Sequence, residues 1–278
     1  MPESESMTTP LQTRLAGAAL LAALSTSPAF AQWQEDKWTF DASIYLYLPD
    51  IGGHTAFPPR SGGSNINVSI DTILDNLNFT FMGTFEARKG RWGVFTDFIY
   101  LDVDGDHGGT RDFSVGNVDV PGNVTADLNV GVKGTAWTLA GTYRLAADPA
   151  FTADLLFGAR LLDIDQTLDY DFSADFGQFV GPGRSGRAEA NLNYWDAVVG
   201  VKGRYRFGEN KEWFIPYYVD VGTGDSDLTW QAFTGIGYTF SWGSLLGGWR
   251  YLDYDFKSSS KVEKLDFNGP MLGVAFAW

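Results

Sequence analysis

Apolar and polar residues alternate along two well-separated segments of the chain. In residues 78–88 the apolar or small positions Phe79, Phe81, Gly83, Phe85 and Ala87 are separated by mostly polar or charged residues. In residues 195–207 one face carries Trp195, Ala197, Val199, Val201, Gly203, Tyr205 and Phe207, and the other carries Asp196, Lys202, Arg204 and Arg206. A period of two residues is the signature of a β-strand, so both segments are predicted to be strands with one apolar and one polar face.

The same pattern, punctuated by turn residues, predicts ten strands. Their expected ranges are 38–48, 78–88, 91–104, 125–144, 150–166, 188–206, 212–222, 228–241, 244–257 and 266–278. Short connections alternate with longer ones, as in an antiparallel up-and-down sheet. Eight or twelve strands stay open, because residues 65–70 fit a further strand and the alternation slips near 136–137, where a bulge is expected.

Aromatic residues gather at one end of the expected strands, and the chain stops inside the last strand. The five tryptophans beside short turns or termini are Trp38, Trp92, Trp213, Trp242 and Trp278. Tryptophan at a shared depth is typical of a girdle at a membrane interface. After residue 31 no run of eighteen apolar residues could form a spanning helix, so an all-β transmembrane barrel is predicted. A soluble two-layered sandwich is the competing fold.

The start of the chain has the pattern of an export signal. A basic residue precedes an apolar stretch at 15–24, and an Ala-Phe-Ala sequence follows, which signal peptidase cleaves. We therefore predict a cleaved signal peptide at 1–31 and one barrel domain at 32–278, exported through the periplasm to a bacterial outer membrane. The acidic opening is unusual for a signal, so Met7 is an alternative start to Met1. An anchoring helix is the other interpretation, although the apolar stretch is short for one.

Composition and charge exclude several classes of function. The formal net charge is −14, and the basic residues form no patch that could neutralise phosphates, so nucleic acid is not an expected partner. The chain has no cysteine, which excludes disulfides, thiolate nucleophiles and thiolate metal sites. Charged residues make up 19% of the chain, below the roughly 25% of soluble domains. No cofactor is expected.

Charged residues on the polar faces of the strands are predicted to line the interior of the barrel. They are Glu86, Arg88, Asp97, Lys133, Asp154, Arg160, Asp196, Lys202, Arg204, Arg206, Asp220 and Arg250. Because both signs are represented in a narrow barrel, these side chains are expected either to pair and fill the lumen or to leave a thin, weakly selective passage. The sequence leaves both outcomes open.

Carboxylates are also expected at the outward mouth of the barrel. Asp102, Asp104 and Asp106 loosely resemble a calcium loop, and oxygen-rich clusters suit Ca²⁺. The spacing is incomplete and the closing Glu is missing. A solvated acidic rim, in which Asp residues end the strands, is therefore the alternative interpretation.

A short helix is expected in the first long connection. Residues 71–77 place Ile73, Leu74 and Leu77 on one side of a helical turn, which Ser69 or Asp71 could cap. This helix is expected to cover the barrel mouth, to fold inward or to lie on the lipid surface.

Catalysis has little support in the sequence. The two histidines, His54 and His107, both fall in expected outward loops. An acid–base pair formed by these histidines with nearby aspartates is the one enzymatic alternative. We therefore expect no enzymatic activity and no catalytic residues.

Three segments resemble small, largely uncharacterised outer-membrane β-barrel proteins of the OmpA, OmpX and OmpW kind. These segments are residues 79–93 (FTFMGTFEARKGRWG), 248–255 (GWRYLDYD) and 268–278 (NGPMLGVAFAW). The resemblance implies insertion by the barrel-assembly machinery, contact with outer-membrane lipid and lipopolysaccharide, and a monomer. The expected function is a narrow solute channel or an envelope structural barrel. The alternatives are an interaction or adhesion barrel with acidic, cation-binding outer loops, or an outer-membrane hydrolase.

Overall fold

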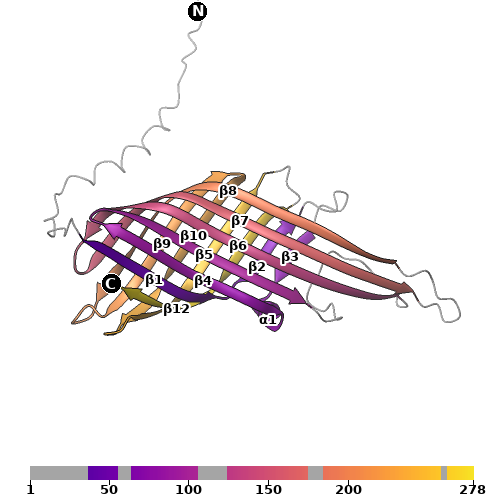
Figure 1. Ribbon diagram of the computed structural model, residues 1–278, viewed down its shortest axis with the longest axis horizontal. Coiled ribbons are helices and arrows are strands. Elements are labelled where there is room, and N and C mark those ends of the chain that lie inside the picture. Colours follow the sequence, from indigo (N-terminus) through magenta and orange to yellow (C-terminus); the bar gives the residue numbers. More distant parts are fainter. Residues whose placement is uncertain (1–36, 56–63, 106–123, 175–183, 258–261) are drawn as a thin grey trace, which may run out of the picture. The chain divides into compact units, whose positions relative to one another are not determined.

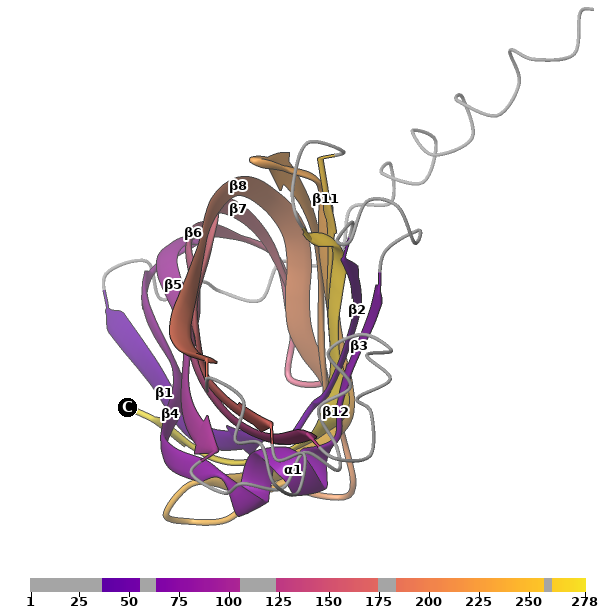
Figure 2. The same cartoon turned by 90° about the vertical axis from the view of Figure 1, so that its right-hand side faces the viewer.

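Ten antiparallel strands form a closed barrel in the computed structural model (Figures 1 and 2). The structure describes residues 37–55, 64–105, 124–174, 184–257 and 262–278, so the expected signal peptide lies outside the described residues. The barrel strands are β1 (Trp38–Tyr47), β4 (Leu77–Lys89), β5 (Trp92–Gly105), β6 (Val124–Ala147), β7 (Phe151–Ala174), β8 (Arg184–Phe207), β9 (Trp213–Gly224), β10 (Ser226–Thr239), β11 (Ser244–Phe256) and β12 (Val262–Ala277). Each pairs with the next in this order, and β1 also pairs with β12, which closes the sheet.

The ten expected strands are all confirmed, and the competing sandwich is wrong because a single sheet closes on itself. The largest differences in length are at β7 and β8, which each have 24 residues. β8 begins at Arg184 rather than at residue 188, in a stretch with few large apolar side chains. Hydrophobic alternation therefore could not mark the outer end of this strand.

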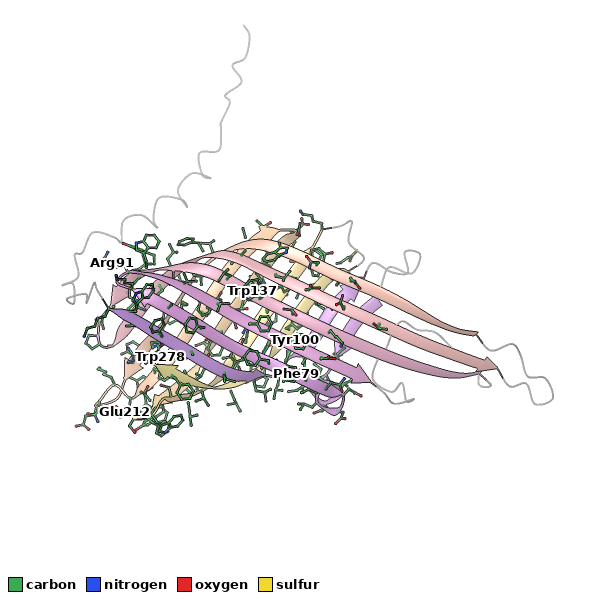
Figure 3. All side chains as sticks on the ribbon, viewed as in Figure 1. Phe79, Arg91, Tyr100, Trp137, Glu212 and Trp278 are labelled. Atoms are coloured by element: carbon green, nitrogen blue, oxygen red, sulfur yellow. The ribbon has the colours of Figure 1, made fainter. Side chains whose placement is uncertain are left out.

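The bulge expected near residues 136–137 is not found. β6 pairs with β5 in unbroken register there, with Ala136 opposite Ile99 and Trp137 opposite Phe98. The register shift in β6 falls instead between Arg144 and Ala146. The alternation slips at 136–137 because apolar side chains occupy both faces of the wall at this height. Ala136 lines a cavity inside the barrel, and Trp137 lies on the outside (Figure 3).

The first long connection is more ordered than expected. It contains β2 (Asp50–Thr55), β3 (Ser64–Val68) and α1 (Ile70–Asp75). The predicted helix is found, with Ser69 as its N-cap: the Ser69 side chain accepts a hydrogen bond from the Thr72 backbone N–H. The expected apolar face is wrong in part, because Ile73 is buried but Leu74 is exposed and Leu77 belongs to β4. None of the described helices is long and apolar enough to cross a membrane. The further strand expected near 65–70 is β3, which pairs with β2 and adds no strand to the closed ring.

Tight turns join the strands at one end of the barrel. Gly90, between β4 and β5, has a φ of 60°, a left-handed conformation that glycine adopts without strain. Between β6 and β7, the Asp148 carboxylate accepts hydrogen bonds from the backbone N–H groups of Ala150 and Phe151, both at 2.8 Å. We call this the inner end, since short turns face the periplasm in outer-membrane barrels.

Large apolar side chains are exposed in a belt around the outside of the barrel. They include Ile44, Phe81, Phe85, Val94, Leu139, Phe157, Val199, Val201, Val219, Val221, Ile236, Leu245 and Leu272. An apolar belt of this extent would be unfavourable in water but matches the hydrocarbon core of a bilayer, where a closed barrel satisfies every backbone hydrogen bond. The chain is therefore built to span a membrane.

The longest strands extend well beyond that membrane. Crossing takes about 9–11 tilted residues per strand, whereas β6, β7 and β8 each have 24. At a rise of about 3.3 Å per residue each is about 80 Å long. Because their inner ends are joined by short turns, the excess length projects from the outer end, as Figure 1 shows.

Candidate functional site

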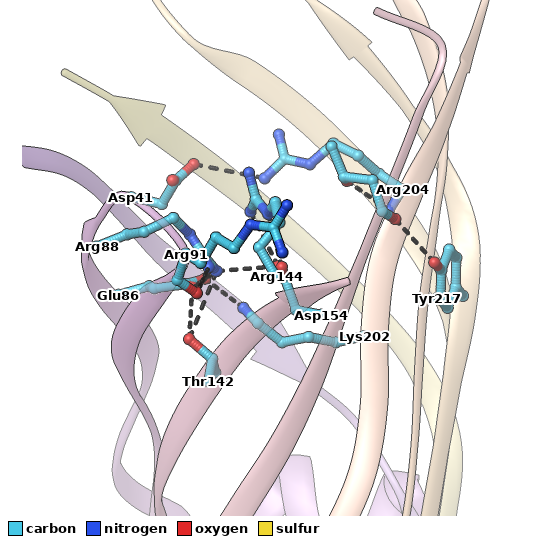
Figure 4. Close-up of polar contacts among 11 residues, drawn as sticks. Asp41, Glu86, Arg88, Arg91, Thr142, Arg144, Asp154, Lys202, Arg204 and Tyr217 are labelled. Atoms are coloured by element: carbon cyan, nitrogen blue, oxygen red, sulfur yellow. Dashed lines mark hydrogen bonds and ion pairs between the residues drawn. The ribbon is translucent and has the colours of Figure 1, made fainter. Parts of the chain in front are cut away.

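Five charged side chains meet inside the inner half of the barrel, and we call them the inner network (Figure 4). They are Glu86 and Arg88 of β4, Arg144 of β6, Asp154 of β7 and Lys202 of β8. Asp154 accepts from Arg144 at 2.6 Å and from Arg88 at 2.9 Å, while Glu86 pairs with Arg88 and Lys202. The contact between Lys202 and Glu86 crosses the lumen between strands that are not neighbours. The network therefore ties the two sides of the barrel together.

A second group of side chains lies further out, and we call it the Arg250 network. The Arg250 guanidinium donates to Asp97 at 2.7 Å, to Gln231 at 2.6 Å and to the Tyr45 hydroxyl at 2.9 Å. Tyr45 in turn donates to Asp97. These residues come from β1, β5, β10 and β11, so this network also reaches across the lumen.

A third group, the Arg160 network, occupies the remaining side of the lumen. Arg160 of β7 pairs with Asp220 of β9 and donates to Thr138 at 3.1 Å and to Thr229 at 3.3 Å. Tyr218 also donates to Asp220. Arg160 and Asp220 are each 1% exposed, which places an ion pair in the water-excluded centre of the barrel.

The structure places every predicted lumen residue except Lys133 on the inner face of the wall. Asp196 is buried there and accepts from the Ser226 backbone N–H at 2.9 Å. Arg204 and Arg206 lie on the same face of β8 near the inner mouth, and Arg204 pairs with Asp41 at 3.4 Å. The prediction is wrong for Lys133.

Lys133 lies on the outer face of β6, where its side chain is 60% exposed and its ammonium is 3.1 Å from Asp102. The error has the same origin as the unobserved bulge. Its neighbour Val132 faces the lumen cavity, so an apolar side chain takes the position that a polar-lumen pattern assigns to the lysine.

Several lumen residues were missed from the sequence. Arg144 was not predicted to face the lumen, because the register shift that follows it in β6 interrupts the alternation of faces. Tyr45, Tyr218 and Gln231 alternate with lipid-facing residues, and that alternation was the available signal. Aromatic and amide side chains are less obvious lumen residues than charged ones.

Further outward the lumen becomes apolar. Two residues beyond Asp97, Arg160 and Arg250 along their strands lie Ile99, Leu162 and Leu252, which line a cavity of about 130 Å³. The other lining residues are Tyr47, Pro49, Ile51, Val68, Ile73, Met82, Leu101, Val103, Val132, Gly134, Thr135, Ala136, Ile164, Leu192, Val262, Leu265 and Phe267. The lining of the lumen thus changes from charged to apolar over two residues along each of these strands.

The five predicted girdle tryptophans are all exposed near the inner end of the barrel. Trp278 stacks on Phe40, which also stacks on Trp38, with ring centroids 5.8 and 6.1 Å apart. Trp92 packs edge-on against Tyr143, Trp213 contacts Phe207 and Tyr238, and Trp242 contacts Phe240 and Phe276. Their function as an interfacial girdle stays a prediction.

Further aromatic pairs lie on the outside, at the height of the lumen cavity. Trp137 packs against Trp195 at 6.3 Å, and Phe79 against Tyr100 at 6.0 Å. Figure 3 shows Trp137, Tyr100 and Phe79 on the barrel wall, away from the end that holds Trp278. These four residues are not among the predicted girdle residues.

The calcium site stays a prediction. Asp106 and the side chain of Asp104 lie outside the described residues, and Asp102 pairs with Lys133. In the part of the chain that the structure describes, no three carboxylate or histidine side chains form a group that could hold a metal ion.

The histidine pair also stays untested. His54 lies on β2, with its Nε2 atom 3.7 Å from the Glu263 carboxylate. His107 lies outside the described residues. The expected partner of His54 was Asp50, and that of His107 was Asp104 or Asp106; in the structure the His54 ring lies beside Glu263 of β12.

Comparison with solved structures finds other barrels. The outer membrane protease OmpT from Escherichia coli is 10% identical with a TM-score of 0.46, over 90% of this chain and 99% of that one. The attachment invasion locus protein Ail of Yersinia pestis is 11% identical with a TM-score of 0.30, over 87% and 99%. The translocator domain of autotransporter NalP from Neisseria meningitidis is 12% identical with a TM-score of 0.28, over 86% and 88%.

No protein-family model and no curated protein sequence matches the chain. The comparisons therefore assign it no substrate, partner or activity. Its own features are more informative: a closed barrel of ten strands and an apolar belt exposed around its outside. By these features the chain is an outer-membrane β-barrel protein.

Proposed function

We propose that the protein is an envelope barrel whose lumen is closed to solutes, rather than a channel. The observation that supports this proposal is the pair of ionic contacts across the middle of the barrel. Arg250 with Asp97, and Arg160 with Asp220, fill the lumen at one level, and all four side chains are at most 5% exposed.

The energetics favour a permanent closure. Removing one partner of a buried ion pair destabilises a protein by about 3–5 kcal/mol, because the other charge is left buried without compensation. A passing ion would have to displace these contacts at each crossing. The inner lumen does contain a polar cavity of about 200 Å³, lined by Asp154, Lys202 and Arg204 among others, but its lining ends at Asp97 and Arg250. The cavity is therefore a dead end.

Planar-bilayer recording of the full mature chain tests the proposal. We expect no conductance steps above the lipid background. A variant with Arg250→Ala, Asp97→Ala, Arg160→Ala and Asp220→Ala removes both pairs together and is expected to conduct, whereas a lipid-facing Val219→Ala control stays silent. Regular conductance steps from the unaltered protein would contradict the proposal.

A second candidate function, surface interaction, is favoured by the length of β6, β7 and β8 beyond the membrane. We propose that these projecting ends contact lipopolysaccharide, with divalent cations neutralising the acidic side chains of the barrel and the anionic groups of the lipopolysaccharide. Deletion of residues 167–187 leaves the membrane-crossing parts of β7 and β8 in place. It is expected to reduce calcium-dependent binding of lipopolysaccharide to the purified barrel, and unchanged binding would exclude this role for the ends of β7 and β8.

A further inference from the structure

We propose that the apolar cavity in the outer half of the lumen is a binding site for an uncharged hydrocarbon group of about six carbon atoms. The group would enter through the seam between β3 and β4, which α1 covers. The lining, the shape of the wall and the placement of glycine support this assignment independently of whether the barrel conducts.

The chemistry of the lining selects the ligand. The side chains around the cavity are almost all apolar, and most are aliphatic, with Phe267 and Met82 beside them. The Tyr47 hydroxyl is the main polar group, and it is already satisfied, because it donates to the Phe267 carbonyl oxygen at 2.8 Å. Water needs two or more polar partners to occupy such a space, and an engineered apolar cavity of about 150 Å³ in another protein stays dry and binds benzene. A cavity of about 130 Å³ suits a group of similar size.

The floor of the cavity excludes charged ligands. Asp97, Arg160 and Arg250 lie one step inward and direct their charges at partners within the lumen. A charged group in the cavity would be desolvated among aliphatic side chains without a counter-ion, which is strongly unfavourable.

The cavity is left open by a small residue that local packing does not require. A Cβ atom built on Gly134 of β6 would meet no atom of the described residues within 4 Å. Other barrel glycines behave differently: a Cβ on Gly158 or Gly203 would collide with the backbone of the neighbouring strand. Protein interiors normally fill such voids, so Gly134 preserves a space at the expense of packing.

The wall beside the cavity is not a continuous ladder. In the inner half, β1 pairs with both β4 and β12, with Ile44 opposite Gly83 and Tyr47 opposite Met271. In the outer half, β2 takes over the pairing with β12, and β3 pairs with β2. Within the described residues no pairing joins β3 to the outer half of β4, and α1 lies there instead (Figure 2).

α1 contributes one side chain to the lining of the cavity at this seam. Ile73 is 3% exposed and lines the cavity, whereas the adjacent Leu74 is 46% exposed and does not line it. The helix has six residues and is held by local contacts, including a hydrogen bond of 2.9 Å from the Ile70 N–H to the Asp50 carboxylate. A segment held in this way can open at lower free energy than a strand with partners on both sides.

Fluorine NMR of fluorobenzene with the full mature chain in lipid nanodiscs tests the site. We expect a saturable bound signal in addition to the partitioning seen with empty nanodiscs. Gly134→Leu and Ala136→Leu fill the cavity and are each expected to weaken saturable binding at least tenfold. The matched control Val94→Leu adds a methylene group on the lipid-facing side and is expected to leave binding unchanged.

Two further measurements identify the source of the bound hydrocarbon group and its route into the cavity. Nanodiscs whose lipids carry fluorine at the end of the acyl chain are expected to show a second resonance if a lipid chain supplies the group, and this resonance would be lost in Gly134→Leu. Ile73→Ala shortens the side chain at the seam and is expected to accelerate exchange of the bound probe several-fold. Unchanged exchange would overturn entry at the seam.

The proposed site is overturned if neither probe gives a saturable signal, or if Gly134→Leu binds as the unaltered protein does while showing the same heat-modifiable gel migration. Ala136→Leu provides the second variant if Gly134→Leu fails to fold. Because none of these measurements depends on conductance, failure here leaves the proposal of a closed lumen intact.

Discussion

Arg250 of β11 and Asp97 of β5 meet across the barrel, with 2.7 Å between Nη2 and Oδ2. The two strands are not neighbours in the sheet, and the residues are 153 positions apart in the chain. The contact therefore reports closure of the barrel rather than local structure. It also divides the lumen, with ionic networks on the inner side and the apolar cavity on the outer side.

Loss of this contact is expected to destabilise the barrel substantially. Arg250→Ala leaves the Asp97 carboxylate buried without its guanidinium, and the free energy of unfolding should fall by about 3–5 kcal/mol. Reversible urea unfolding in lipid vesicles measures this. Arg204→Ala is the matched control, because its pair with Asp41 is partly exposed and contributes at most about 1 kcal/mol. Equal losses in the two variants would contradict the buried role of Arg250.

The position of the membrane can be read from charge substitutions on the outer face. Val199 of β8 is exposed on the outer face between Trp195 and Tyr205, so Val199→Arg is expected to cost about 2–4 kcal/mol. Leu145, beside the inner turn after β6, is also exposed, and Leu145→Arg should cost about 0–1 kcal/mol. The same unfolding assay compares them. A larger cost at Leu145 would show that the belt is misplaced.

Two glycines should respond oppositely to the same added methyl group. A Cβ on Gly203 of β8 would collide with the Thr152 backbone oxygen and with Tyr217, so Gly203→Ala is expected to cost about 1–3 kcal/mol. Gly134→Ala enters open space and should be neutral, or stabilising by about 0.5–1 kcal/mol. Thermal unfolding monitored by gel migration distinguishes the two. A similar loss at both positions would argue against the void at Gly134.

The cap of α1 should control local opening at the seam. Ser69→Ala removes the acceptor for the Thr72 N–H and is expected to weaken the helix by about 0.5–2 kcal/mol. Hydrogen exchange measured by mass spectrometry should become faster in residues 70–76 and stay unchanged in the barrel strands. Ser69→Asp keeps a capping oxygen and should restore protection. Faster exchange with Ser69→Asp as well would show that the cap is not the cause.

Much of the wall could be predicted from the sequence because strand alternation is a local property. Each strand repeats every two residues whatever its partners are, so the ten strands, their inner turns and the lumen positions of residues such as Glu86 and Asp220 followed from spacing. The prediction failed at Lys133, where the lumen itself is apolar and the contrast between faces disappears.

By itself, the sequence determined that the chain forms a membrane-spanning barrel, that short turns join its strands at the inner end and that the inner lumen is polar. These features depend on which residues alternate along each strand. Only the tertiary structure decided which charges pair across the lumen, that β2 replaces β1 beside β12, and that Gly134 borders a void. These features depend on register and closure. Side chains brought together by closing a sheet come from strands that carry no information about one another until the ring is complete.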